Sequence, residues 1–264
     1  MRIKLQLIGV LILLVAIGTL DFSCSEPIKQ TYTDTLSYQT KTLQRVYQNC
    51  NLDSANCTHI TYSYPDFNDN STTAKELNKL IADVFGVTKN LTLEQTQFTF
   101  MSEYEAYVKE FKNEAATWYS QTNISVPFQT NNVTCISVEM DDYTGGAHGM
   151  FSTIHTNFFK PKHEVLTLKK IFNDSSLSEL LTIAEADFRT ANELTPEDDF
   201  DEVGFWFKDN QFHLNDNFIL TAEGITWLYN PYEIGPYSQG TIELNVSKNE
   251  LLPLLNEQYK LMWE

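Results

Sequence analysis

Hydrophobic and polar positions along the chain follow two periods, and each period predicts one kind of secondary structure. In several segments the apolar residues recur three and four positions apart, which is the spacing of one face of an amphipathic helix. The helices predicted in this way span residues 72–85, 92–118, 177–194 and 248–255. Gly86 follows the first helix and Ser247 precedes the last, at positions that often end and begin helices.

Other segments alternate apolar and polar residues and are rich in β-branched and aromatic side chains, which predicts strands. The predicted strands span residues 35–48, 57–67, 124–128, 135–143, 150–159, 164–168, 205–207, 211–214, 218–220, 225–229 and 242–246. Helices set among antiparallel strands are typical of the α+β class. We therefore predict antiparallel sheets with helices packed on them, in two intimately associated halves.

The start of the chain has the pattern of an export signal. Arg2 and Lys4 precede an apolar stretch over residues 5–20, and Cys24 follows a small residue, Ser23. We expect a lipoprotein signal peptide at 1–23, a lipid on Cys24 that anchors the chain in a bacterial membrane, and a polar tether at 24–33. Secretion without a lipid and an uncleaved anchor are the alternatives, although the apolar stretch is shorter than the ~20 residues of a spanning helix.

Composition and net charge limit the classes of molecule that this protein is expected to bind. Hydrophobic residues make up 42% of the chain, which suffices for a sizeable core, and the formal net charge is −17. Nucleic acids and anionic lipid surfaces require positive charge, so we expect no nucleic-acid partner. A basic protein remains a compatible partner.

The cysteines indicate an oxidising compartment. Cys50 and Cys57 flank a turn-like stretch, and a disulfide between them would close this loop. Cys135 lies in an apolar, alternating segment and is expected to be buried. The acidic loop at 196–202 lacks the spacing of a calcium loop, and no cysteine–histidine spacing typical of zinc is present, so we expect no metal ion and no cofactor.

Three local motifs stand out. Residues 141–149 read DDYTGGAHG and place three glycines and a histidine between two predicted strands. Residues 220–229 read LTAEGITWLY and predict a hairpin with an aromatic exit strand. Residues 230–240 read NPYEIGPYSQG, in which two prolines and two glycines favour a rigid, non-repetitive loop.

The sequences YTGGAHG at 143–149 and YNPYEIGPY at 229–237 resemble those of a bacterial envelope family that contains the DUF3298 domain. The resemblance covers residues 30–255. It implies an N-terminal DUF4163-like domain at 34–160, of a kind found beside peptidoglycan deacetylase domains, and a C-terminal DUF3298-like domain at 161–264. Relatives include the lysozyme-sensing part of anti-sigma factors, so the resemblance implies a sensor-like or accessory module.

His148 has three interpretations. The favoured one is structural, with the imidazole hydrogen-bonded to backbone in the glycine turn. A general base oriented by Asp141 or Asp142 is the catalytic alternative. Metal binding together with His155 is the third, although their spacing matches no common ligand pattern.

Aromatic residues gather just after the predicted hairpin. Trp227, Tyr229, Tyr232 and Tyr237 lie within eleven positions, and such side chains fill cores or anchor interfaces. We expect Tyr232 and Tyr237 to be exposed, and we name Tyr229, Tyr232, Glu233, Tyr237 and His148 as candidate ligand-binding residues. Glu233 is expected to accept hydrogen bonds within its own loop, and an acid–base pair with Glu223 is the alternative.

These observations favour an envelope lipoprotein that acts as a non-catalytic binding or sensing module. The candidate partners are a lysozyme-like protein and peptidoglycan glycan. An enzyme acting on cell-wall glycan, with His148 and nearby carboxylates, is the rival hypothesis. A lipoprotein with a purely structural role is the third.

Overall fold

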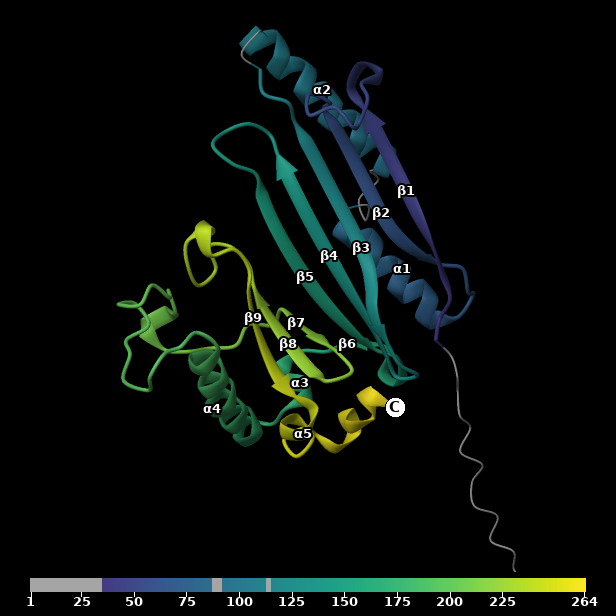
Figure 1. Cartoon of the computed structure of the whole chain (residues 1–264). Helices are drawn as coiled ribbons and strands as arrows, with labels where there is room; N and C mark the ends of the chain where they lie inside the picture. Colours follow the sequence, from purple (N-terminus) through teal and green to yellow (C-terminus); the bar gives the residue numbers. More distant parts are fainter. Residues whose placement is uncertain (1–34, 87–91, 113–114) are drawn as a thin grey trace, which may run out of the picture. The chain divides into compact units, whose positions relative to one another are not determined.

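The computed structural model describes residues 35–86, 92–112 and 115–264 (Figure 1). The expected signal peptide, Cys24 and the tether at 24–33 lie outside these residues. The chain from Thr33 to the C-terminus forms a compact unit by itself. Within the described part, none of the helices combines the length and the hydropathy needed to cross a bilayer.

The larger sheet has six strands that follow one another in sequence order (Figure 1). They are β1 (Tyr38–Val46), β2 (His59–Phe67), β3 (Tyr119–Gln129), β4 (Val133–Tyr143), β5 (Met150–Phe159) and β6 (Glu164–Val165). Neighbouring strands are antiparallel except β2 and β3, which are parallel. A parallel pair needs a long crossover, and the two helices between these strands provide it.

These helices are α1 (Thr72–Val84) and α2 (Leu93–Phe111). Each begins at a hydroxyl cap: the side chain of Ser71 accepts from the Ala74 amide, and Thr92 forms a capping box with Gln95. The buried side chains of α1 pack against one face of the sheet. That core consists of Phe67, Ala74, Leu77, Ile81, Ile124, Ile136, Val138 and Phe158.

The second sheet is small and antiparallel, in the order β7 (Phe218–Leu220), β8 (Gly224–Tyr229) and β9 (Ile242–Ser247). Three helices accompany it: α3 (Leu168–Ile171), α4 (Asp174–Ala191) and α5 (Lys248–Leu251). Their core is shared with the larger sheet, because Val133 and Cys135 of β4 are buried among its members. The structure is therefore α+β, as predicted, and the two halves are joined by a common core.

Short 3-10 segments complete the fold at Tyr47–Asn49, Lys160–Lys162, Lys208–Asn210, Tyr237–Gln239 and Glu257–Trp263. The strands predicted at 205–207 and 211–214 are wrong. Asp209 and Asn210 adopt left-handed backbone angles, with φ of 56° and 55°, so the chain turns between the two segments instead of extending. Phe205 and Phe207 instead pack edge-on against Phe188 of α4.

Asparagine side chains join the two sheets along β5. The side-chain amide of Asn230 accepts from the Thr153 N–H at 2.7 Å and donates to the Thr153 carbonyl at 3.0 Å. Asn217 accepts from the His155 N–H at 2.8 Å and also donates to the Thr153 carbonyl, at 2.9 Å. Asn157 of β5 reciprocates with the backbone of β7. These amides act as a neighbouring strand would, and they fix where the 230–240 loop begins.

Candidate functional site

Two of the motifs that stand out in the sequence meet in the structure. His148, from the turn between β4 and β5, stacks on Tyr237, with ring centroids 4.2 Å apart and 21° between the planes. Tyr232 closes the group, since its ring lies 5.5 Å from that of Tyr237 and its hydroxyl lies 3.3 Å from Nε2 of His148. We call His148, Tyr232 and Tyr237 the aromatic cluster.

The hydrogen bonds of His148 define its tautomer. Nδ1 lies 2.8 Å from the Gly149 carbonyl oxygen, which can only accept, so Nδ1 carries the proton. In the neutral ring Nε2 is then an acceptor, and the Tyr232 hydroxyl donates to it. This bond to the backbone of the glycine turn is the one that the structural interpretation predicts.

The turn that carries His148 depends on its glycines. Gly145 and Gly146 have φ angles of 100° and 103°, which other residues rarely adopt. A Cβ atom at Gly149 would lie 3.0 Å from both the Tyr119 hydroxyl oxygen and the Asp142 carbonyl oxygen. The Tyr143 hydroxyl also donates to the Gly146 carbonyl at 2.9 Å. The turn is therefore held in place by the ends of β3 and β4.

The 230–240 loop is held by Glu233. One carboxylate oxygen accepts from the backbone N–H of Asn230 at 2.9 Å, and the other accepts from the side chain of Asn215 at 2.6 Å. Between them, Tyr232 has a φ of 72°, which is uncommon for a bulky residue and places its ring beside His148. Side chains held in such conformations cluster at functional sites, because the surroundings must compensate for the strain.

The candidate ligand-binding tyrosines differ in how much of each side chain is exposed to solvent. Tyr232 is 49% exposed and Tyr237 is half-buried, whereas Tyr229 is only 1% exposed. The assignment of Tyr229 to a ligand-binding site is therefore corrected: β8 is the central strand of its sheet, and the Tyr229 hydroxyl donates to the His213 carbonyl at 2.8 Å. Burial raises the pKa of Tyr229. Trp227 is likewise part of the core.

Sequence reasoning missed Tyr119, which lies beside the aromatic cluster. Its hydroxyl donates to Asp141 at 3.1 Å. Burial raises the pKa of Tyr119, and the Asp141 carboxylate and the Tyr237 hydroxyl raise it further. The predicted strand began only at residue 124, so the pairing of Tyr119 with Tyr143 across β3 and β4 was not visible in the sequence.

The groups of the catalytic alternatives are not brought together. Nδ1 of His148 bonds to a carbonyl, and Asp141 bonds to Tyr119, so neither forms the histidine–carboxylate pair of a general base. Glu223 directly precedes β8 and Glu233 lies in the loop that follows it, so most of a six-residue strand, about 16 Å long at about 3.3 Å per residue, separates them. Paired glycosidase carboxyls lie about 5–10 Å apart.

His155 lies on β5, away from the glycine turn. Its Nδ1 is buried and has no hydrogen-bond partner among the described residues. Burial lowers the pKa of this imidazole. Within the described ranges, no group of three or more His, Cys, Asp or Glu side chains is placed to hold a metal ion.

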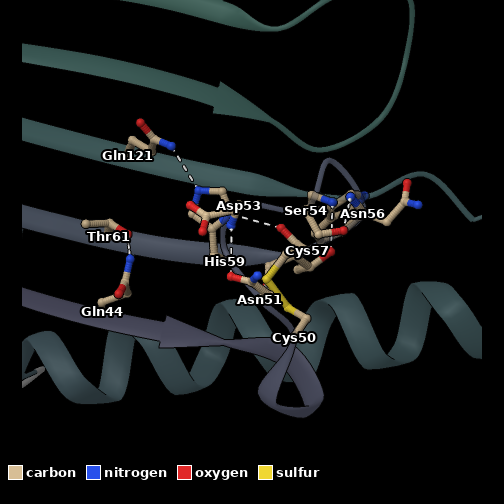
Figure 2. Close-up of a disulfide and its surroundings, with 12 residues drawn as sticks. Gln44, Cys50, Asn51, Asp53, Ser54, Asn56, Cys57, His59, Thr61 and Gln121 are labelled. Carbon is tan, nitrogen blue, oxygen red and sulfur yellow. Dashed lines mark hydrogen bonds between the residues drawn. A yellow bond between two sulfur atoms is a disulfide. The ribbon is translucent and has the colours of Figure 1, made fainter.

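The cysteines near the N-terminal sheet are bonded. Cys50 and Cys57 form a disulfide that closes the loop between β1 and β2 (Figure 2). Cys135 is a free thiol, and burial raises its pKa to about 12. Such a thiol is protonated and unreactive at neutral pH.

The fold and the two loops define a two-part α+β protein in which each part contributes to one exposed aromatic cluster. Residues 52–151 match the family model described as Deacetylase PdaC, and residues 169–249 match DUF3298, a protein of unknown function. The C-terminal part of the chain is thus similar to the DUF3298 family, and the N-terminal part to the deacetylase model. His148 lies in the first matched segment and Tyr237 in the second, so their contact joins the two.

Solved structures of DUF3298 family proteins share the fold of this chain. A DUF3298 family member from Bacteroides fragilis NCTC 9343 is 22% identical, with a TM-score of 0.67. A DUF3298 family protein from Pseudomonas aeruginosa PAO1 is 21% identical, with a TM-score of 0.61. Each alignment covers 85% of this chain and 96% of the other. No curated protein matches the chain.

Proposed function

We propose that this chain is a non-catalytic binding module of the bacterial cell envelope, and that its aromatic cluster contacts a basic, lysozyme-like protein. The observation that carries the proposal is the meeting of two loops, far apart in sequence, in one ordered and exposed group of rings. Tyrosine offers apolar area and a hydroxyl together, and it is enriched at binding hot spots.

The loops are ordered before any partner arrives. Tyr232 is fixed by its neighbours Asn230 and Glu233, and Tyr237 by its stack on His148. A preorganised loop loses little conformational entropy when it docks, so more of the contact energy contributes to affinity. Trp206 is a further exposed aromatic residue next to this loop, because it is 48% exposed and its backbone N–H bonds to the Ile234 carbonyl of the loop.

Charge favours a basic partner. The chain carries a formal net charge of −17. Glu233 is exposed within the loop, and Asp141 and Asp142 lie at the base of the glycine turn. Common lysozymes are basic, so an acidic surface would accelerate their association. The resemblance to the lysozyme-sensing part of anti-sigma factors points to the same class of partner.

Calorimetric titration of the fragment 33–264 with a basic lysozyme tests the proposal. We expect saturable binding that weakens between low and physiological salt, because salt screens long-range attraction. Tyr232→Ala and Tyr237→Ala should each cost about 2 kcal/mol or more of binding free energy. Tyr38→Ala is the matched control, since Tyr38 is 39% exposed on β1 and lies outside the cluster.

Two results would contradict the proposal. Absence of binding at both salt concentrations would remove the lysozyme-like protein as the partner. Binding that both tyrosine variants retain in full would remove the aromatic cluster as the contact surface.

The envelope location is part of the proposal and rests on the sequence. The pattern of residues 1–24 supports export, cleavage before Cys24 and lipid attachment at that cysteine. A lipid anchor with a ten-residue tether at 24–33 would hold the described unit close to the membrane surface, where an incoming lysozyme-like protein would meet it.

A further inference from the structure

A hollow of about 610 Å³ lies at the end of β2, β3 and β4, beside the disulfide loop. Its walls are the loop 52–57, the chain at Ala116 and Thr117, and the rings of His59, Tyr119 and Tyr143. We call it the disulfide hollow. Its volume is within the range of about 300–1,000 Å³ that is usual for small-molecule sites.

The three rings form a row because their positions are paired across the strands. His59 pairs with Tyr119 between β2 and β3, and Tyr119 pairs with Tyr143 between β3 and β4. Paired residues point to the same face of a sheet. The ring centroids are 6.1 Å apart for the first pair and 6.0 Å apart for the second.

Each ring in this row is held by its own polar atom. Nδ1 of His59 donates to the Cys57 carbonyl at 2.9 Å, and Nε2 accepts from the Gln121 side chain at 2.9 Å (Figure 2). The hydroxyls of Tyr119 and Tyr143 donate to Asp141 and to the Gly146 carbonyl. The rings are therefore in place before a ligand binds, which lowers the entropic cost of binding.

The lining selects against charged ligands. Among its described residues there is one carboxylate, that of Asp53, and no lysine or arginine. Phosphate or carboxylate ligands require cationic partners, and a polycation would require several acids. Ser54, Thr117 and Asp53 nevertheless add polar groups, so a purely apolar ligand would leave them unpaired. The ligand that fits is uncharged and carries both an apolar surface and hydroxyl groups.

Polar side chains continue from the hollow along the same face of the sheet. Gln121 and Asn123 of β3 pair with Asp141 and Glu139 of β4, and Asn123 donates to Glu139 at 3.2 Å. Gln121, Asn123 and Glu139 are exposed. A ligand made of several linked rings could thus extend from the hollow along this face and contact amide and carboxylate groups at successive positions.

We propose that the disulfide hollow binds a sugar ring of an uncharged oligosaccharide. A pyranose ring presents C–H groups on its faces, which pack on aromatic rings, and hydroxyl groups at its rim, which bond to polar side chains. The adjoining rings of the oligosaccharide lie along Gln121 and Asn123. This site adjoins the aromatic cluster at Tyr119 and Tyr143 but includes none of its three residues, and it does not depend on the protein partner proposed there.

Titration of the fragment 33–264 with cellotetraose and with tetra-N-acetylchitotetraose tests the inference. Binding is measured by calorimetry and by the NMR chemical shifts of the backbone amides in β2–β4. We expect at least one sugar to bind saturably and to shift residues around the hollow. Tyr143→Ala should weaken binding at least tenfold. Ala55→Trp should also weaken it at least tenfold, by filling the hollow without removing a wall contact.

The controls separate this site from the aromatic cluster and from loss of fold. Tyr232→Ala should leave sugar affinity within twofold of wild type. Ala55→Trp keeps the test valid if Tyr143→Ala unfolds. The inference is overturned if neither sugar binds up to its solubility limit, if Ala55→Trp leaves affinity unchanged, or if spermidine binds the hollow in place of the sugars.

Discussion

The imidazole of His148 lies flat against the phenol ring of Tyr237, with 4.2 Å between the ring centroids. The two residues are 89 positions apart in the sequence and come from the two segments that match different family models. Their contact shows why a glycine turn and a proline-rich loop occur together in one chain: each supplies one side of a single surface.

Replacing His148 should loosen this surface without unfolding the protein. His148→Ala removes the stack on Tyr237 and the bond to the Gly149 carbonyl. Because the ring is exposed, we expect a loss of about 1 kcal/mol of unfolding free energy, seen as a fall of a few degrees in Tm. His213→Ala is the matched control, since His213 is exposed and lies outside the cluster. An equal loss in both variants would contradict a specific role for His148.

Asn217 should contribute more to stability than its partial exposure suggests. Its side chain accepts from the His155 N–H and donates to the carbonyls of Thr153 and Leu228. Asn217→Ala leaves the His155 N–H unpaired between the two sheets and removes one of two side-chain donors from each of these carbonyls, so we expect a loss of about 2–3 kcal/mol in chemical denaturation. Asn131→Ala, at an exposed turn, should change stability by less than about 0.5 kcal/mol. Comparable losses in the two variants would refute the role of Asn217 in joining the sheets.

His155 should make stability depend on pH. Burial lowers the pKa of this imidazole below its ordinary value of about 6.5. As pH falls below that value, the unfolded chain binds a proton that the folded chain does not, so the free energy of unfolding decreases. His155→Gln should flatten the fall between about pH 6.5 and 5.5, measured by denaturant titration at several pH values. Parallel curves for the variant and the wild type would show that another group is responsible.

Cys24 should determine where the protein resides. Cys24→Ser removes the lipid attachment that we propose, so the variant should leave the membrane fraction in a fractionation of producing cells. Leu52→Ser, at an exposed position in the disulfide loop, is a neutral comparison that should stay with the membranes. A serine variant that remains in the membrane fraction would argue against the lipid anchor.

The sequence predicts most regular elements because their periodicity is strong. The helix predicted at 177–194 is α4, displaced toward the N-terminus because Asn173 caps it. The helix predicted to reach residue 118 ends at Phe111, since Lys112 has a φ of 50° and residues from Tyr119 onward join the sheet. Strand pairing in the tertiary structure sets this helix boundary, and the periodicity of the sequence does not reveal it.

The candidate site was predictable only in part. Tyr232, Tyr237 and His148 stand in motifs dense in glycine and proline, which mark special backbone conformations. Their proximity depends on the asparagine bonds along β5 and on the register of β3 with β4, which are long-range relationships. Tyr119 and His59 lie in ordinary strand sequences. Strand pairing alone places both of them in the disulfide hollow, and it places Tyr119 beside the cluster as well.

Hydrogen–deuterium exchange during titration with a basic lysozyme tests the central claim most directly, because it reports both loops at once. If the aromatic cluster is the contact surface, peptides covering 143–149 and 229–240 should gain protection together. Helix α4, which packs on β9 and contributes no residue to the cluster, should not change. Protection of only one loop, or protection confined to other parts of the chain, would contradict the account of a single surface built by His148, Tyr232 and Tyr237.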